Sequence, residues 1–555
     1  MVGSTIGYNI IAIFAAEVIR DMIRISRAYI ISMSERHVAV LAIVLCLPAF
    51  FLNLGMIAFI GDEAIRSLVA FEMKLSGNFI VPTLNGEAYF NKPPLYNWFI
   101  YLVSTAFGYF GEWPTRVTTL IFLGVFAYTV YHYVRKHFDQ LTALTMAMML
   151  LTSGRILLWD SMLGLIDICF SWVIYLNFMI LYSLGKAQRW KALFILSYVL
   201  FSIAFLLKGL PAVVFQGISI LTALQLHGVL KRKVFSADHW IGIGLGIIPV
   251  VLYYILYASQ VNLQEVFGIL LDQSMQRTGT THGLWKTITH IFTFPLEQSY
   301  HFLPWSLLVI MTFHPQFRSW MRQHEFIRFN FWMLVANLPV YWLSVQVYPR
   351  YVLMFVPLFN MVGYFVLLQS RETSQSWWRT IRYIFLGLTA VACIATLLMP
   401  IAQSVRELPG IVVTWIAGSV LMAGSLLAMW WDERRTFLWF TICLLVVRSV
   451  FDVVVLPLRE QGHPVNLCRE DCRRVAGKYG EQTWYLYKET FTHQVARFYT
   501  SAYSGQIIRP VDTAIDPKAI YLVDTNLYPD FPGVQVDSVL IEGNQHLALM
   551  RVSLK

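Results

Sequence analysis

Residues 61–98 read GDEAIRSLVAFEMKLSGNFIVPTLNGEAYFNKPPLYNW, and this stretch lies between two strongly apolar segments. It opens with an acidic pair, Asp62 and Glu63, and carries a lone lysine, Lys92, before two prolines. Its first half has the pattern of a helix that starts at the acidic pair and ends at Gly77. Charged residues at the edge of an apolar run favour a functional site at a membrane boundary.

The composition identifies the class of protein. Hydrophobic residues make up 57% of the chain and charged residues 13%, with a mean hydropathy of +0.58. A soluble domain carries about 25% charged residues, so the sequence predicts an integral membrane protein. The net charge of +10 fits basic cytoplasmic loops, and it does not require a nucleic-acid partner.

Apolar runs of the length that a bilayer requires predict thirteen spans. They are 38–60, 115–134, 140–154, 161–184, 192–208, 210–229, 239–258, 300–313, 329–347, 351–369, 383–400, 411–431 and 437–457. Basic clusters occupy alternate loops, which the positive-inside rule assigns to the cytoplasm. These clusters are Arg135-Lys136, Lys186/Arg189/Lys191, Lys231-Arg232-Lys233, Arg318/Arg322/Arg328, Arg371/Arg379/Arg382 and Arg434-Arg435. The N-terminus is then inside, and residues 61–114 and 458–555 are outside.

A further apolar run, 95–111, is ambiguous. Both of its ends lie outside under this topology, and at ~1.5 Å per residue it is about 25 Å long, short for a crossing. We therefore predict a helix that lies along the outer interface. The alternative is that 95–111 spans the bilayer and a short run such as 140–154 does not.

The two ends of the chain differ from its centre. Residues 7–34 predict an amphipathic helix on the cytoplasmic surface, because charged residues interrupt the apolar core that a cleavable signal needs. The predicted organisation is a cytoplasmic segment 1–37, a transmembrane domain 38–457 with its outer loop 61–114, and an outer α/β domain 458–555.

The α/β character of the tail rests on local patterns. TWYLYKE, AIYLVDT, VDSVLIEG and HLALMRV are typical of short strands, and REDCRRVAGKYG is typical of a helix that ends at Gly480. Cys468 and Cys472 lie in this polar segment. Their spacing leaves a disulfide open in an oxidising compartment, whereas no His or Cys cluster completes a zinc site.

Ionisable residues gather at the outer ends of the predicted spans: Asp62, Glu63, Arg155, Asp160, Asp167, Lys208, Arg277, His282 and Arg350, with Tyr351 beside the last. Seven residues separate Asp160 from Asp167, which predicts that they share one helix face. A carboxylate can act as general base, and several Lys and Arg side chains suit a phosphate. At membrane depth that phosphate is most simply a lipid headgroup, such as a polyprenyl phosphate leaving from a sugar.

Structural roles remain open for the same residues. One such role is to place a charged group at the membrane interface while the apolar stem of the side chain stays in the bilayer. This can apply to Arg155, Lys208 and Arg350. The aspartates Asp160 and Asp167 can cap helices or pair with buried arginines.

The opening stretch resembles the first outer loop of bacterial lipid A aminoarabinose transferases and their protein O-mannosyltransferase relatives. Both are GT-C glycosyltransferases that use polyprenyl-phosphate sugars. The similarity continues in order from about 38 to 370, through FGEWPTRVTTL, GRILLWDSMLGLID, LLKGLPAVV, FLPWSLL and YPRYVLMFVPL. The resemblance implies thirteen spans, two interfacial helices in the first outer loop and an outer C-terminal domain.

The resemblance also implies roles for individual residues. It places the catalytic carboxylate at Asp62, beside Glu63, and the lysine that contacts the carrier phosphate at Lys92. Further family positions fall on Tyr89, Asp160, Lys208 and Arg277, and a late tyrosine falls on either Tyr348 or Tyr351. Arg155 and Arg350 are candidate substrate contacts because of their place at the outer ends of the spans.

Two positions depart from the family pattern. Aminoarabinose transferases usually have a glutamate, associated with a bound metal, where this chain has Asn91, so the resemblance carries no metal over. The family arginine three residues after the catalytic aspartate is replaced by Ile65. Arg66 follows it, and we predict that Arg66 contacts the substrate or its phosphate.

The sequence thus predicts an inverting glycosyltransferase of the bacterial inner membrane, with its site facing the periplasm. A lipid A, protein or glycan acceptor would take the sugar from a polyprenyl-phosphate donor. The alternative is a transporter or flippase of polyprenyl-linked glycans, for which half-chain repeats and helices broken near the midplane are more typical.

Overall fold

The computed structural model describes Arg24 and residues 27–275, 284–488, 490, 493–542 and 545–553. Contacts group the chain into two compact units, each assembled from separated segments. The first contains Met1–Asn53, Val134–Thr152 and Leu367–Leu458, and the second contains Leu54–Tyr133, Ser153–Val366 and Arg459–Lys555. Most of the predicted N-terminal helix lies outside the described residues, although residues 27–32 are helical.

Eight helices in the described part of the chain are long and apolar enough to cross a bilayer. They are α5 (Glu112–Arg135), α8 (Asp167–Lys186), α9 (Trp190–Lys208), α12 with α13 (Ala237–Ala258), η3 with α20 (Pro349–Thr373), α21 with η4 (Gln375–Ile401), α23 (Ile411–Trp431) and η5 with α24 (Glu433–Glu460). The predicted polytopic helical membrane fold is therefore confirmed. The total of thirteen spans stays a prediction.

The remaining predicted spans are shorter or interrupted. They correspond to α2 (Glu35–Phe51), α10 (Pro211–Leu226), η2 (Trp305–Phe313) after α16 (Leu284–His301), and α18 (Glu325–Asn337) with α19 (Pro339–Trp342). Prolines begin α10 and α19, because a residue without an N–H suits the first turn of a helix and disrupts its interior. The predicted span 140–154 corresponds to α6 (Gln140–Leu151), which ends before Gly154.

Asp160 and Asp167 do not share a helix face, so that prediction is wrong. Asp160 opens the short helix η1 (Asp160–Met162), which follows α7 (Gly154–Leu158). The chain then leaves the helical conformation before α8 begins at Asp167. Helical spacing places residues on one face only where the helix is continuous.

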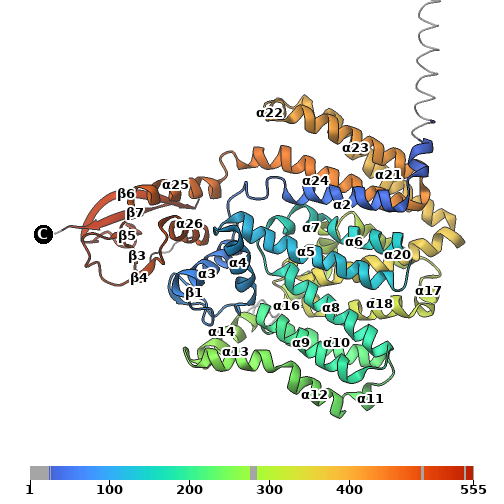
Figure 1. Cartoon of the computed structure of the whole chain (residues 1–555), viewed down its shortest axis with the longest axis horizontal. Helices are drawn as coiled ribbons and strands as arrows, with labels where there is room; N and C mark the ends of the chain where they lie inside the picture. Colours follow the sequence, from blue (N-terminus) through green and yellow to red (C-terminus); the bar gives the residue numbers. More distant parts are fainter. Residues whose placement is uncertain are drawn as a thin grey trace, which may run out of the picture. The chain divides into compact units, whose positions relative to one another are not determined.

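The first outer segment folds as a helix, a hairpin and a second helix (Figure 1). The first helix, α3 (Asp62–Ser76), ends at Gly77 with φ +70°, as predicted. The hairpin of β1 (Thr83–Leu84) and β2 (Glu87–Ala88) turns through Asn85 and Gly86, both at positive φ. The second helix, α4 (Leu95–Phe107), is only about 20 Å long at ~1.5 Å per residue, which supports the predicted interfacial position.

Glu72 fixes the hairpin to α3. Its carboxylate accepts hydrogen bonds from the Thr83 hydroxyl at 2.6 Å and from the N–H groups of Asn85 and Gly86 at 2.6 and 3.1 Å. Burial raises the pKa of Glu72, and these hydrogen bonds oppose that effect. The Asn85 side chain also donates to the carbonyl of Ile508 at 2.9 Å, which ties the hairpin to the C-terminal domain.

The C-terminal domain contains a five-stranded sheet in the order β4-β3-β5-β7-β6. Its elements are α25 (Pro464–Tyr479), β3 (Trp484–Tyr487), α26 (Gln494–Ser504), β4 (Arg509–Val511), β5 (Ile520–Val523), β6 (Gly533–Glu542) and β7 (Gln545–Val552). The strands β4, β3 and β5 are parallel, and β7 pairs antiparallel with β5 and β6. The four predicted strands and the predicted helix are all present, whereas α26 and β4 were not predicted.

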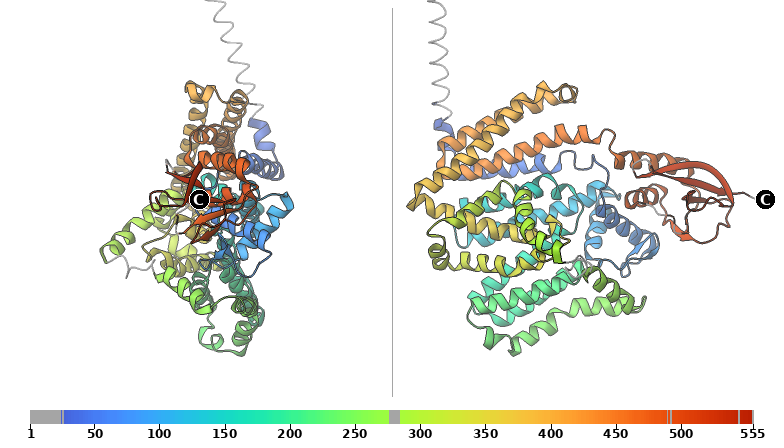
Figure 2. Two further views of the ribbon diagram at one scale, coloured as in Figure 1. Left: turned by 90° about the vertical axis from the view of Figure 1, so that its left-hand side faces the viewer. Right: turned by 180° about the vertical axis from the view of Figure 1, so that it is seen from behind.

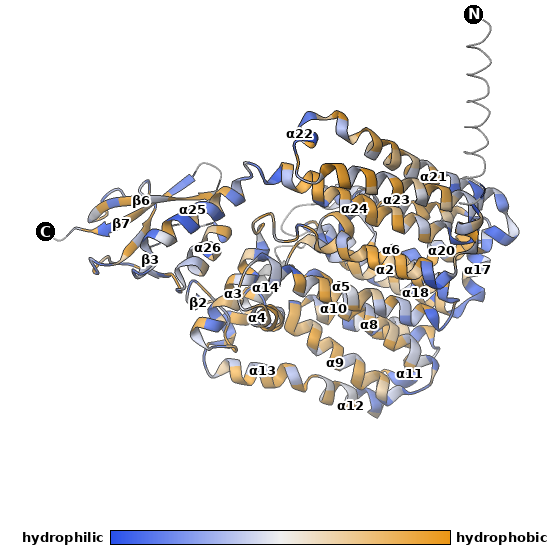
Figure 3. Cartoon of the chain, turned by 45° about the horizontal axis from the view of Figure 1, so that its top comes forward, coloured by the Kyte–Doolittle hydropathy of each residue, from blue (hydrophilic) through white to orange (hydrophobic). Residues whose placement is uncertain are grey.

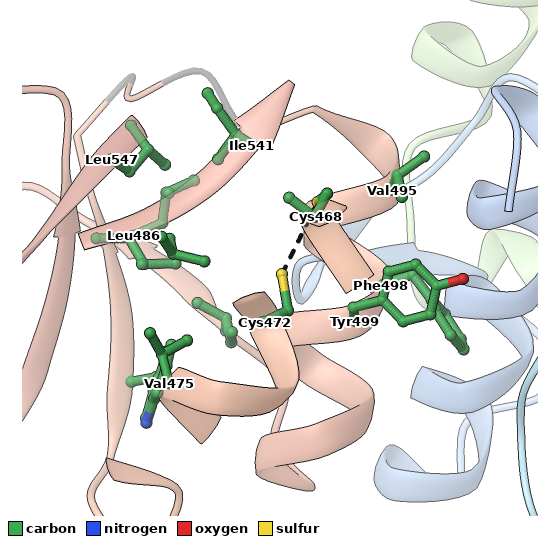
Figure 4. Close-up of a cluster of buried hydrophobic side chains, with 14 of the residues drawn as sticks. Cys468, Cys472, Val475, Leu486, Val495, Phe498, Tyr499, Ile541 and Leu547 are labelled. Carbon is green, nitrogen blue, oxygen red and sulfur yellow. Dashed lines mark hydrogen bonds between the residues drawn. The ribbon is translucent and has the colours of Figure 1, made fainter. Parts of the chain in front are cut away.

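A buried cluster joins this domain to the first outer segment (Figure 4). Residues of α25, α26 and the sheet pack there against Phe59, which precedes α3, and Phe59 lies edge-on to Phe498 at 4.8 Å. The Cys468 and Cys472 thiols belong to the cluster, with 3.9 Å between their sulfur atoms and no disulfide. The C-terminal domain therefore shares a core with the outer loop.

In the same unit, α9 and α12 lie side by side among the green helices of Figure 2, and they pack through glycines. A Cβ added at Gly242 of α12 would lie 2.4 Å from the Cβ of Phe194 on α9, and one at Gly246 would lie 2.2 Å from that of Tyr198. Only glycine permits this approach of the two helices. Shorter helices complete the described chain: α11 (Leu230–Lys233), α14 (Leu263–Met275), α17 (Phe317–Gln323) and α22 (Gln403–Arg406).

The other unit is a bundle of α2, α6, α21, α23 and α24. Its apolar contacts include Cys393 on α21, Met422 on α23 and Cys443 on α24. Figure 3 shows long hydrophobic stretches along α21, α23 and α24. A buried ion pair within α24 joins Arg448 to Asp452 at 2.8 Å.

The contact between the C-terminal domain and the outer segment yields a prediction. The Tyr499 hydroxyl accepts a hydrogen bond from the Phe59 N–H at 2.9 Å and donates one to Glu112 at 2.6 Å. We expect Tyr499→Phe to lower the free energy of unfolding by about 1–3 kcal/mol, because it leaves a buried N–H without a partner. Denaturant unfolding followed by tryptophan fluorescence measures this change.

Tyr503→Phe is the matched control. The Tyr503 hydroxyl accepts an exposed hydrogen bond from Arg473 at 3.2 Å, so its loss should cost less than about 0.5 kcal/mol. Equal effects of the two substitutions would contradict the role given to Tyr499.

Candidate active site

A turn at Gly61 sets the direction of the acidic pair. Gly61 precedes α3 with φ +56° and ψ −126°, a conformation that side-chain-bearing residues rarely adopt. Asp62 is the first residue of the helix, and its side chain is 53% exposed. The neighbouring Glu63 is fully buried. The two acids therefore point to different environments.

Glu63 is saturated by hydrogen bonds. One carboxylate oxygen accepts from the Ile60 N–H at 2.7 Å and from Arg116 at 2.8 Å. The other accepts from Arg116 at 3.2 Å and from the Gly164 N–H at 2.8 Å. Four donors on two oxygens leave little capacity for a substrate, which favours a structural role for Glu63. Its catalytic role stays a prediction.

Asp62 lines a cleft of about 590 Å³. The other residues that line it come from α3, from the segment after the hairpin, from the segment before η3 and from α26: Ile65, Arg66, Tyr89, Asn91, Lys92, Val345, Gln346, Val347, Tyr348 and Gln494. Of the predicted site residues, the cleft brings together Asp62, Arg66, Tyr89, Lys92 and Tyr348.

Arg66 is buried yet only partly satisfied. One of its terminal nitrogens donates to the Tyr89 hydroxyl at 2.8 Å, and its guanidinium lies 5.5 Å from the centre of the Tyr89 ring. The other terminal nitrogen, Nη1, has no hydrogen-bond partner among the described residues. A buried donor without a partner is costly, and in a cleft it is available to a ligand.

Arg350 bridges two carboxylates. Its side chain lies 3.1 Å from a carboxylate oxygen of Asp62 and 3.3 Å from one of Asp167. The same guanidinium lies 4.3 Å from the centre of the Tyr348 ring and 5.7 Å from that of Tyr351. Arg350 thus links the exposed carboxylate of the cleft to a buried network.

The rest of this network is mostly buried in sequence-distant helices, and its members pair with one another. Lys208 contacts Asp167 at 2.5 Å, and its ammonium lies 3.9 Å from the centre of the Tyr351 ring. Arg155 pairs with Asp160 at 3.1 Å. Four of the predicted site residues that the structure describes do not line the cleft: Arg155, Asp160, Lys208 and Tyr351. Their position favours a role in holding the lining residues in place over direct contact with a substrate. Arg277 and His282 lie outside the described residues.

The structure adds lining residues that sequence reasoning missed. Gln346 precedes Arg350, and Gln494 is the first residue of α26 in the C-terminal domain. The Oε1 atom of Gln494 is buried without a hydrogen-bond partner among the described residues. Neither glutamine belongs to a motif, and only the shared core of the C-terminal domain and the outer segment could have located Gln494. Within the described part of the chain, no three His, Cys, Asp or Glu side chains gather as a metal site would require.

Comparison with known proteins gives one family model and one curated relative. Residues 91–254 match the model of the dolichyl-phosphate-mannose-protein mannosyltransferase family. An uncharacterized protein of Aquifex aeolicus (strain VF5) is 24% identical over 327 residues, which are 58% of this chain. The aligned part spans 62% of that relative, less than two thirds of its length.

Solved structures show the same fold. ArnT from Cupriavidus metallidurans bound to undecaprenyl phosphate superposes with a TM-score of 0.69 at 17% identity, covering 94% of this chain and 99% of ArnT. The apo form of that protein gives a TM-score of 0.63 at 17% identity, over 92% and 97% of the two chains. The predicted resemblance to GT-C glycosyltransferases is therefore confirmed at the level of the fold.

The contrast between Asp62 and Glu63 is testable by stability. Glu63→Gln leaves the buried Arg116 without its charged partner and should cost about 3–5 kcal/mol of unfolding free energy. Asp62→Asn alters an exposed carboxylate and should cost less than about 1 kcal/mol. Thermal unfolding of both purified variants in one detergent checks the contrast, and a reversed order would overturn it.

Proposed function

We propose that this chain, which has the GT-C glycosyltransferase fold, transfers a sugar from a polyprenyl-phosphate donor to an acceptor at the periplasmic face of the bacterial inner membrane. The acceptor is a hydroxyl group of a lipid A, protein or glycan, and the reaction inverts the configuration at the anomeric carbon of the sugar. One observation carries the proposal: an exposed carboxylate, Asp62, shares a cleft with the cations Lys92 and Arg66.

Asp62 acts as the catalytic carboxylate. Its exposed oxygen accepts the proton of the attacking acceptor group while the acceptor oxygen forms a bond to the anomeric carbon of the sugar. The bond from that carbon to the phosphate oxygen breaks at the same time, and its electron pair leaves with the polyprenyl phosphate. Arg350, 3.1 Å from Asp62, orients the carboxylate.

Two cations that line the cleft receive the leaving group. Lys92 binds the carrier phosphate, and the unpartnered Nη1 of Arg66 supplies a second donor to it. Fixed positive groups of this kind stabilise the charge that develops on a leaving phosphate in the transition state. Tyr89 holds Arg66, and Tyr348 covers the cleft beside Arg350.

The buried network positions Arg350. Asp167 holds one edge of its guanidinium, and Lys208 neutralises Asp167. Arg155 and Asp160 form a second pair nearby in the same unit. In this assignment Glu63 is structural: with Arg116 it fixes the start of α3 and so the place of Asp62.

The lining also indicates the class of sugar. Three carboxamides, Asn91, Gln346 and Gln494, line the cleft, and carboxamides are suited to hydroxyl groups because they both donate and accept. Among the described lining residues Asp62 is the sole carboxylate, and it is paired with Arg350. We propose a sugar that is neutral and hydroxylated, since an ammonium group would meet two cations and no unpaired carboxylate there.

Transfer activity tests the catalytic assignment. With an undecaprenyl-phosphate sugar donor in proteoliposomes, Asp62→Asn should lower kcat by about 10²–10⁴, because it removes the general base. Lys92→Ala should lower kcat/KM by about 10–100-fold, because it removes one charged hydrogen bond to the phosphate. Lys74→Ala, which removes a lysine of α3 outside the described lining of the cleft, is the control and should stay near wild type.

The same proteoliposomes separate an enzyme from a transporter. Label that moves from donor to acceptor supports transfer, whereas intact donor that only crosses the bilayer supports a flippase. Wild-type turnover by Asp62→Asn would refute the catalytic assignment. Mass spectrometry of lipid A and surface glycoproteins from a deletion strain then identifies the acceptor.

A matched donor pair tests the class of sugar. Undecaprenyl phosphate carrying arabinose should be used at least about tenfold better at pH 7 than the same donor carrying 4-amino-4-deoxyarabinose, because a single unfavourable charge contact costs about 1.4 kcal/mol or more. The ratio of kcat/KM values measures the preference. A preference for the amino sugar would refute the neutral class but leave sugar transfer intact.

A further inference from the structure

A second cleft lies between the start of α9 and the start of α12, away from the candidate active site. Its volume is about 570 Å³, and it is lined by Gln188, Arg189, Trp190, Lys191, Ala192, Ile195 and Asp238. Two of these residues are cations, and α11 with its three basic residues leads into α12. The proposed transfer reaction makes no use of this cleft.

The walls of the cleft are preformed. Gly242 and Gly246 bring α12 into close contact with α9, and His239 of α12 stacks on Phe194 at 4.5 Å. His239 also shares a hydrogen bond of 2.7 Å with the Tyr198 hydroxyl. These contacts fix the separation of the two helices, so the cleft does not depend on a ligand to hold it open.

The turn before α9 is fixed as well. Gln188 has φ +56°, and its side-chain oxygen accepts a hydrogen bond from the Trp190 indole at 3.2 Å. Trp190 is buried, and the ammonium of Lys233 lies 5.8 Å from the centre of its ring. The buried indole of Trp190 therefore forms a fixed part of the cleft wall next to the lysine and arginine side chains.

The charge of this region is not balanced. Lys233 pairs with Asp238 at 3.0 Å. Arg189, Lys191, Lys231 and Arg232 are exposed and form no ion pair with any residue that the structure describes. Figure 3 shows α11 as a hydrophilic segment at the end of hydrophobic helices. Two other basic residues of these loops are paired: Lys186, at the end of α8, pairs with Glu325, and Arg382 of α21 pairs with Glu433.

The apolar side of the cleft faces the membrane-spanning parts of the two helices. Ala192 and Ile195 belong to the span Trp190–Lys208. The exposed aromatic residues Phe235 and Trp240 lie at the start of the neighbouring span, 78% and 60% exposed. Aromatic residues at such positions mark the interface between headgroups and acyl chains. The cleft thus combines cations, an indole and an apolar edge at one interface.

We infer that this cleft binds the headgroup of an anionic phospholipid, with phosphate oxygens on Arg189 and Lys191 and the acyl chains along Ile195. The cations on α11 extend the site, which favours a lipid with two phosphates, such as cardiolipin. Basic pockets between transmembrane helices suit headgroups of this type, whereas a soluble anion would gain nothing from the apolar edge.

Native mass spectrometry of the full chain in detergent, titrated with tetraoleoyl cardiolipin, tests the inference. Arg189→Gln with Lys191→Gln should weaken binding by roughly thirtyfold, from the contribution of two cations near a membrane surface. Asp238→Asn should strengthen binding by about fivefold, because it removes the acid of the cleft and frees Lys233. Thermal unfolding without lipid confirms that each variant is folded.

Arg318→Gln with Arg322→Gln is the charge-matched control, on α17 and outside the described lining of this cleft. It should change cardiolipin binding by less than about threefold. Equal weakening by both double variants would overturn the inference, as would equal binding of dioleoylphosphatidylcholine. If millimolar inorganic phosphate displaced cardiolipin, the cleft would be a site for a free anion, and the inference of a lipid site would be overturned.

Discussion

The buried ion pair between Glu63 and Arg116 is the constraint on which the outer face of the molecule depends. Arg116 also donates hydrogen bonds to backbone carbonyls of the loop before α3. Glu63 accepts hydrogen bonds from the N–H groups of Ile60 and Gly164. Three separate segments are thereby fixed to one carboxylate. Breaking a buried pair costs several kcal/mol, so this arrangement holds the first turn of α3 rigidly. Asp62 occupies that turn, and its exposed position follows from the burial of its neighbour.

The C-terminal domain has a second, related role. Its helix α26 packs against Phe59 through a shared apolar core, and Tyr499 bonds to both Phe59 and Glu112. The same helix begins with Gln494, which lines the cleft together with Asp62. A domain that is remote in the sequence is therefore part of the candidate site. The shape of the candidate cleft and the stability of the outer segment then rest on the same contacts.

Local signals predicted the elements that depend on local chemistry. The helix from Asp62 to Gly77 follows from acidic residues at its start and a glycine at its end. The tail strands follow from short runs of residues that favour strands. The failures occurred where packing overrides local pattern. Asp160 and Asp167 have helical spacing, yet the chain leaves the helix between them. The edge strand β4 contains only Arg509–Val511 with a proline at its centre, so it carries no periodic signal.

By itself the sequence determined the membrane class, the helical fold, the resemblance to GT-C glycosyltransferases and the polar loop that carries Asp62 and Lys92. Only the tertiary structure decided which acid of the pair faces the cleft. Successive residues of a helix point about 100° apart, and the choice between them is made by Arg116, which lies 53 residues from Glu63 along the chain. Pairing over such a separation leaves no local pattern, because it depends on how distant segments pack.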